Sequence, residues 1–137
     1  MKTETKTRTL ELEDIAFLRK FASVEQMNCL VDGLRSPERG YFREAITSMV
    51  DRIKTMPKTY ETDGQGDKAI AYLHYFRGSQ DWWITEKDME PVQYQAFGLV
   101  DLGGGPEKGY VNIVEIIRAG VELDLHWTPK PLSEVAA

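Results

Sequence analysis

Aromatic residues in the C-terminal half of the chain fall on short runs separated by glycine turns, and this pattern constrains the fold more than any other feature. Short runs rich in aromatic and β-branched residues, bounded by Gly and Pro, are typical of strands. The residues that carry the pattern are Tyr72, Tyr75, Phe76, Trp82, Trp83, Tyr94, Phe97, Tyr110 and Trp127. The pattern predicts a compact β-sheet domain.

The strands can be placed from these runs and from the turns between them. Residues 70–76 carry β-formers on both alternating faces, which predicts a central strand covered on both sides. A turn at 77–81 then predicts a hairpin with the next strand, and Gly120 ends a short helical turn over 114–119. The remaining expected strands are 82–86, 94–102, 110–113 and 121–126.

Three helices are predicted before the sheet, over residues 1–57. Apolar residues from Leu10 to Phe21 recur at spacings of three and four, which is the period of a helix. Ser23 with Gln26 indicates a capping box for the second helix, and Ser36 with Pro37 at the first helical position indicates the start of the third.

Chain length and these patterns together predict one α+β domain. At 137 residues, the chain is long enough to build a hydrophobic core without disulfides. We expect a single domain over 1–137, in which a helical segment packs with a mainly antiparallel sheet of about five strands. The helical half covers 1–57, a loop rich in Gly and Asp covers 58–68, and the sheet half covers 69–137.

Charge is distributed unevenly between the two halves. Residues 1–57 hold ten basic and nine acidic residues, whereas residues 58–137 hold seven basic and thirteen acidic residues. Because phosphate contacts need clustered Lys or Arg, this balance argues against nonspecific nucleic-acid binding by the sheet half. The polar N-terminus and the lack of a long apolar run predict a cytoplasmic protein.

Several common sites do not fit the sequence, so we expect no cofactor and no metal. The glycine cluster at 103–109 predicts a tight strand connection, because Lys108 is followed by Gly109 and not by the Ser or Thr of a phosphate loop. The run from Asp63 to Asp67 lacks the pattern of a calcium loop. Two histidines and one cysteine are too few for a zinc site, and we expect Cys29 to be buried between Met27 and Leu30.

One pair of residues has a spacing that suits acid–base chemistry. Asp124 and His126 lie two residues apart on one face of a predicted strand, and a histidine beside a carboxylate can act as a general base. The alternative is a half-exposed histidine on a polar strand face. We expect His74, in an aromatic strand, to be a hydrogen-bonded core residue, and we interpret the protein as non-enzymatic.

The tryptophan hairpin is the best candidate for a binding surface. Trp82 and Trp83 point to opposite faces if they lie on one strand, so at most one of them belongs to the core. The other is a candidate anchor for a protein partner, because large exposed aromatic side chains are typical of interfaces. The predicted partner-binding residues are Asp81, Trp82, Trp83, Glu86, Asp88 and Glu90.

The helical half offers an alternative. Three helices with a short link between the second and third resemble a helix-turn-helix DNA-binding motif. The candidate nucleic-acid-binding residues are Arg39, Arg43, Arg52 and Lys54 on the third helix. Glu38, Glu44 and Asp51 intervene and reduce the local positive field, so direct nucleic-acid binding is the second hypothesis.

Four motifs in the segment from Trp82 to Val135 resemble a family of small proteins encoded on bacterial plasmids, phages and integrative elements. The motifs are Trp82-Trp83-Ile84-Thr85-Glu86, Ala96-Phe97-Gly98-Leu99 with Asp101, Glu107-Lys108-Gly109-Tyr110, and Glu122-Leu123-Asp124-Leu125-His126-Trp127 before Pro129. Lys108 departs from the family pattern, in which an apolar residue is commoner at this place.

The resemblance implies a role beside mobile genetic elements, whose small accessory proteins often protect the element from host defence. It therefore suggests an interaction module that inhibits a host defence complex, such as an anti-CRISPR or antirestriction protein. An acidic sheet is compatible with this hypothesis, because acidic groups can occupy an arginine-lined nucleic-acid channel. An enzyme using Asp124 and His126 is the third hypothesis.

Overall fold

The computed structural model describes residues 8–135. The helices are α1 (Leu12–Leu18), α2 (Val24–Gly33), α3 (Arg39–Thr55) and α4 (Ile113–Arg118); the strands are β1 (Ile70–Ala71), β2 (Leu73–Arg77), β3 (Gln80–Glu86), β4 (Ala96–Asp101), β5 (Pro106–Val111), β6 (Glu122–Leu123) and β7 (Lys130–Pro131). The predicted polar start over residues 1–7 lies outside the described residues. Between residues 8 and 135, no helix is long and apolar enough to cross a lipid bilayer.

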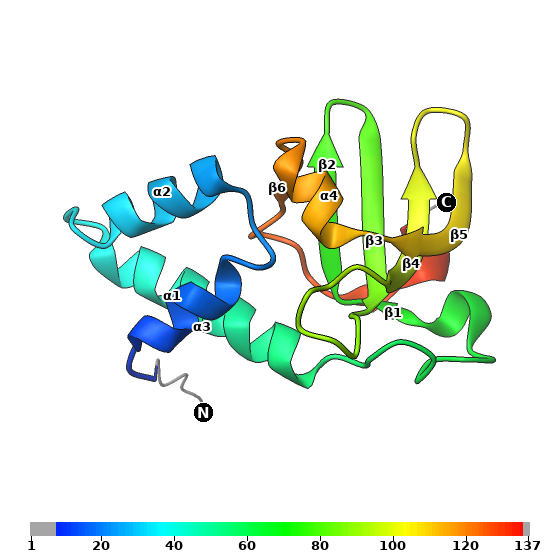
Figure 1. Ribbon diagram of the computed structural model, residues 1–137, viewed down its shortest axis with the longest axis horizontal. Helices are drawn as coiled ribbons and strands as arrows, with labels where there is room; N and C mark the ends of the chain where they lie inside the picture. Colours follow the sequence, from blue (N-terminus) through cyan, green and yellow to red (C-terminus); the bar gives the residue numbers. More distant parts are fainter. Residues whose placement is uncertain (1–7, 136–137) are drawn as a thin grey trace.

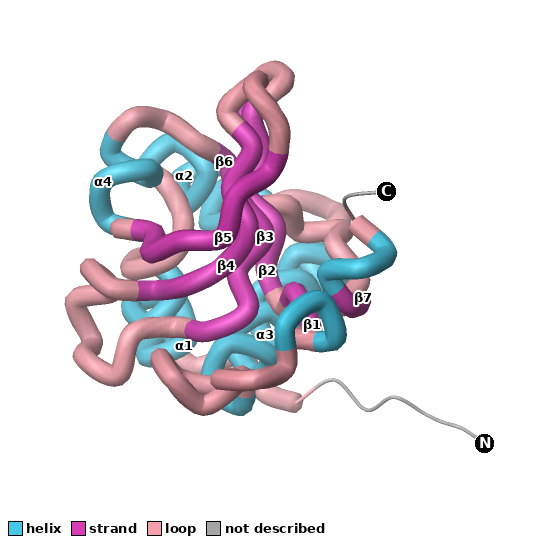
Figure 2. The backbone as a smooth tube through the Cα atoms, turned by 90° about the vertical axis from the view of Figure 1, so that its right-hand side faces the viewer, coloured by secondary structure: helices cyan, strands magenta, loops and turns pink. Residues whose placement is uncertain are grey.

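The α+β class is confirmed: three helices precede a five-stranded antiparallel sheet of order β5-β4-β3-β2-β6 (Figure 1). A second, two-stranded sheet joins β1 to β7. Strand β3 is the central strand. Viewed from the side, strands β2 to β5 lie in front of helices α1, α2 and α3 (Figure 2).

One buried cluster contains side chains from both halves of the chain. Leu18, Phe21 and Ile46 from the helical half pack in it with Tyr75 and Trp82 from the sheet. The Tyr75 hydroxyl donates a hydrogen bond to the Phe21 carbonyl oxygen, so this buried ring has its polar end satisfied. Burial also raises the pKa of Tyr75 well above its usual range. The helices therefore cover one face of the sheet.

The segment predicted as one strand over 70–76 divides at Tyr72. The N–H of Tyr72 donates to the Ile84 carbonyl in the large sheet, whereas Ile70 and Ala71 pair with Pro131 and Lys130 in the small one. The chain thus passes from one sheet to the other within a single residue. Within the large sheet, β2 is paired on both sides, between β3 and β6, and lies one place from the central strand.

The predicted starts of two helices also need correction. Ser23 caps α2 as expected, but the Gln26 side chain does not complete the capping box, because its amide bonds to both the N–H and the carbonyl of Leu123. Helix α3 begins at Arg39, after Pro37. The Ser36 hydroxyl accepts a hydrogen bond from the N–H of Glu38, which forms a turn before the helix.

The buried position predicted for Cys29 is wrong, because its side chain is exposed. At about 100° per residue, Cys29 lies about 160° from Met27 around α2, although the two are close in sequence. Met27, Leu30 and Gly33 form the buried face of the helix.

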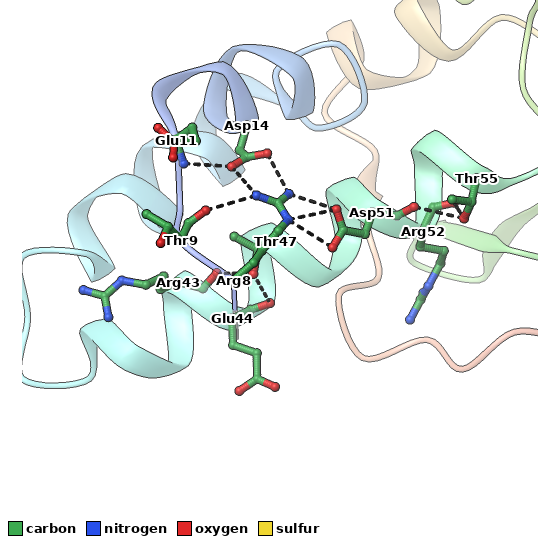
Figure 3. Close-up of polar contacts among 10 residues, drawn as sticks. All are labelled: Arg8, Thr9, Glu11, Asp14, Arg43, Glu44, Thr47, Asp51, Arg52 and Thr55. Carbon is green, nitrogen blue, oxygen red and sulfur yellow. Dashed lines mark hydrogen bonds and ion pairs between the residues drawn. The ribbon is translucent and has the colours of Figure 1, made fainter. Parts of the chain in front are cut away.

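Arg8 joins the start of α1 to α3 through two carboxylates (Figure 3). Its guanidinium donates to both oxygens of Asp14, at 2.7 and 2.8 Å, and to both oxygens of Asp51, at 3.0 and 3.1 Å. Asp14 is buried and also accepts a hydrogen bond from the N–H of Glu11. The bond from Arg8 lowers the pKa of Asp14 from 3.8 to about 2.

Candidate interaction surface

The sheet has two faces with different surroundings. Along β2 and β3, the side chains of Leu73, Tyr75, Trp82 and Ile84 point toward the helices and are buried. We call the opposite side the outer face; its side chains on these two strands are His74, Phe76, Asp81, Trp83 and Thr85. One end of this face is covered by the C-terminal segment, where Leu132 and Trp127 pack near Trp83.

The uncovered end of the outer face carries three acidic residues in one row across the sheet. The strand register aligns Phe76 with both Glu122 and Asp81, and aligns Asp81 with Asp101. We call Glu122, Phe76, Asp81 and Asp101 the acidic row. Glu122 is exposed and the other three are partly exposed, so the row presents an aromatic ring among carboxylates to solvent.

Two carboxylates of this row face each other directly. Asp81 on β3 and Asp101 on β4 are register partners, and like charges in such positions destabilise a sheet. Asp101 uses one oxygen to accept hydrogen bonds from the N–H groups of Gly103 and Gly105, which orders the turn to β5. Its other oxygen has no partner among residues 8–135.

His74 lies next to the row and contacts two carboxylates at once. Its Nε2 is 2.8 Å from Asp81 and its Nδ1 is 2.9 Å from Asp124. The ring therefore bridges the two carboxylates. The ring also stacks on Trp83 at 5.5 Å, which fixes its plane, and its side chain is 14% exposed. The predicted hydrogen-bonded position of His74 is therefore confirmed, although it lies on the outer face and not in the main core.

Asp124 and His126 do not form the side-chain pair that the sequence suggested. The Asp124 carboxylate accepts a hydrogen bond from the backbone N–H of His126 at 2.9 Å, while its other oxygen contacts His74. The exposed His126 ring instead lies 3.4 Å from the hydroxyl of Tyr41. The predicted strand ends early, because β6 stops at Leu123. The backbone N–H of Asp124 makes one further bond, to the His74 carbonyl oxygen, and the chain then turns, so Asp124 and His126 do not lie on one strand face.

The tryptophan pair divides as its alternation predicted. Trp82 is 8% exposed and belongs to the main core, so it is not an anchor on the surface. Trp83 lies on the outer face and is partly buried between His74 and the C-terminal segment. Trp83 therefore lies on the same face as the acidic row and packs against His74, which contacts Asp81.

Glu86 and Asp88, predicted as surface acids, are buried and organise loops. Glu86 is 3% exposed, and its oxygens accept hydrogen bonds from the N–H groups of Tyr60 and Thr62 and from the Thr62 hydroxyl. Asp88 is 7% exposed and accepts bonds from the N–H groups of Glu90 and Gln95. Loop N–H groups without a strand or helix partner require such acceptors, so neither carboxylate is available to a partner.

Of the six predicted partner-binding residues, only Asp81, Trp83 and Glu90 keep exposed surface. Glu90 is exposed but lies in the loop between β3 and β4, away from the outer face. The sequence reasoning missed Asp101, Glu122 and Phe76. Hairpin register would have found Phe76 opposite Asp81, but the positions of Asp101 and Glu122 depend on pairings between distant segments.

A cavity of about 210 Å³ lies between the loop at 60–66 and the outer face. Tyr60 lines it with a φ of 77°, a left-handed conformation that a non-glycine residue rarely adopts. Its backbone is held by the bond to Glu86, and its hydroxyl accepts a bond from Tyr110, which raises the pKa of Tyr110. Glu86 and the two tyrosine hydroxyls of this cavity thus hold the loop.

One of the four basic residues predicted for nucleic-acid binding, Arg52, points away from the others. Arg43 and Arg52 are nine residues apart, about 180° around the helix, and project in different directions (Figure 3). Arg52 is partly buried and donates to the Trp127 carbonyl at 2.9 Å, and burial lowers its pKa. The Lys54 ammonium lies over the ring of Phe17. Arg39 and Arg43 are exposed in the first half of α3.

Within the part of the chain that the structure describes, no three His, Cys, Asp or Glu side chains lie close enough to hold a metal ion. Comparison of the chain with protein-family models, with curated proteins and with solved structures finds no match.

Proposed function

We propose that the protein is a non-enzymatic interaction module whose acidic row binds a basic surface of another protein. The observation that carries the proposal is the direct register pairing of Asp81 with Asp101 on an uncovered sheet face. A sequence selected only for stability would place opposite charges or a neutral pair at such positions. A guanidinium or ammonium group of a partner would relieve the repulsion by lying between the two carboxylates.

The rest of the row suits the same role. Phe76 provides an aromatic ring beside the carboxylates, and Arg side chains both pair with carboxylates and stack on aromatic rings. Asp81 is held in place by His74, which is itself fixed by Asp124 and Trp83. A surface whose charges are already ordered loses little side-chain entropy on binding.

The partner that we propose first is a host defence complex. Support for this choice is the resemblance to proteins of mobile elements, together with the arginine-lined channels that such complexes use to hold nucleic acid. Inhibition of a restriction or CRISPR complex would follow if the acidic row occupied such a channel. The protein would act inside the bacterial cell, where these complexes work.

The test is protection of a plasmid or phage in cells that carry a defined restriction or CRISPR system. The Asp81→Asn, Asp101→Asn, Glu122→Gln variant should lose protection, whereas a matched Glu107→Gln, Glu115→Gln variant, which neutralises exposed acids outside the row, should keep it. Circular dichroism establishes that both variants are folded. Undiminished protection by the triple variant would exclude the acidic row, and DNA binding by the wild type at low salt would favour the helical alternative.

A further inference from the structure

A second exposed surface lies between the two halves of the chain, away from the acidic row. One wall is the connection from α1 to α2, and the other is formed by the loop at 91–94 together with α4. The groove between them has a volume of about 550 Å³. In Figure 1, α4 lies at the side of the sheet nearest to this connection.

The floor of the groove is apolar and uncovered. Val24 is 68% exposed, Val92 is 49% exposed and Tyr94 is 56% exposed, and partly buried Ile117 of α4 lies beside them. Single exposed apolar residues are normal on a protein surface, but several that line one groove are typical of an interaction site.

Both walls of the groove carry positive charge. Arg19 and Lys20 follow α1 on one wall, and Arg118 ends α4 on the other. None of the three forms an ion pair with any residue between 8 and 135, and no acidic residue lines the groove. The chain as a whole has a net charge of −5, so this basic, apolar groove contrasts with the remaining surface.

We propose that the groove binds an acidic amphipathic segment of a protein partner. Apolar side chains of the segment would cover Val24, Val92 and Tyr94, and its carboxylates would pair with the cations on either wall. The number of the charges favours a peptide over a fatty acid, because three cations on two walls can each pair with a carboxylate of an acidic segment, whereas a fatty acid carries only one. This inference does not depend on the acidic row, which lies on the outer face and attracts the opposite charge.

The binding test uses the full chain and a fluorescent 16-residue helical probe peptide with Leu on one face and Glu on the other. We expect saturable binding by fluorescence anisotropy, weakened about tenfold by Arg19→Glu with Arg118→Glu, because rim charges set electrostatic complementarity. Val92→Asp should weaken binding about fivefold through the apolar floor. Arg39→Glu with Arg43→Glu is the matched control, since these exposed cations lie outside the groove, and it should change binding less than twofold.

Three results would overturn the proposal. The first is equal binding of a scrambled peptide of the same composition, which would show attraction of charge without recognition of the apolar face. The second is equal weakening by the control variant. The third is displacement of the peptide by dodecanoate at a lower concentration than by unlabelled peptide, which would identify a lipid as the occupant.

Discussion

Replacement of Asp101 by Asn should stabilise the protein, because it removes one of two like charges that face each other across β3 and β4. Directly opposite Cβ atoms are about 5 Å apart, so the carboxylates lie about 6 Å apart if the side chains diverge slightly. At an effective dielectric constant of about 40 to 80, the repulsion is about 0.7 to 1.4 kcal/mol. Both carboxylates are partly exposed and therefore screened by solvent, so we expect the free energy of unfolding to rise by about 0.5 to 1 kcal/mol.

The amide keeps the structural role of the carboxylate. Asn has a side-chain oxygen that can still accept the hydrogen bonds from Gly103 and Gly105, so the turn between β4 and β5 remains ordered. With an unfolding entropy of about 0.3 kcal/mol/K for this chain length, this rise in the free energy of unfolding corresponds to a Tm increase of about 2 to 3 °C.

Thermal unfolding followed by circular dichroism at pH 7 and low salt would measure the effect. Glu107→Gln is the matched control, because Glu107 is an exposed acid of the same hairpin but has Val100 opposite it. In about 1 M NaCl, where the Debye length is about 3 Å, the difference between wild type and Asp101→Asn should shrink. A Tm equal to or below that of the wild type at low salt would refute the reasoning.

Three further predictions concern the fold. Folding lowers the pKa of Asp14 from 3.8 to about 2 through its bond with Arg8, so the stabilisation that this bond gives is complete above about pH 4 and is lost as the pH falls through 2. Between pH 5 and pH 2.5, the free energy of unfolding in urea should therefore fall by about 1 kcal/mol less in Arg8→Ala than in the wild type. Gly98→Ala should destabilise the protein by about 1 to 3 kcal/mol in urea unfolding, because the new Cβ would collide with the Trp83 carbonyl oxygen and lie 2.9 Å from the Ile84 Cα. Gln26→Leu should lower the free energy of unfolding by about 1 to 3 kcal/mol, because it removes both hydrogen bonds to the backbone of Leu123 and leaves that strand edge unpaired. Hydrogen exchange at the Leu123 amide should become faster.

Local sequence patterns predicted the presence of the helices and strands better than the residues at which they begin and end. The helical spacing, the Ser23 cap and the alternation of Trp82 and Trp83 depend on neighbours within a few residues, and the structure confirms them. The division of the strand at Tyr72 depends on Lys130 and Pro131, which lie far along the chain. No local signal specifies such a pairing, so the sequence showed one strand where two sheets meet.

The candidate site was harder to predict for a related reason. Counting acidic residues near the tryptophan pair could not separate a carboxylate that faces solvent from one that serves loop N–H groups. Asp81 and Glu86 lie near the two ends of β3, yet Glu86 is buried because the N–H groups of the loop at 60–62 need its oxygens.

The two proposed surfaces carry charges of opposite sign. The acidic row lies on the outer face of the sheet, while Arg19, Lys20 and Arg118 surround an apolar groove between the helices and the sheet. Because the groups lie on different surfaces, charge reversal in the groove should leave binding at the row intact, and neutralisation of the row should leave peptide binding intact. If both surfaces bind different proteins, the molecule bridges a basic and an acidic partner. Only a partner that contacts both surfaces at once gains overall affinity from the linkage of two weak contacts. A single shared partner would instead require one molecule to present both charges at the spacing of the two surfaces, which is a stricter geometric condition.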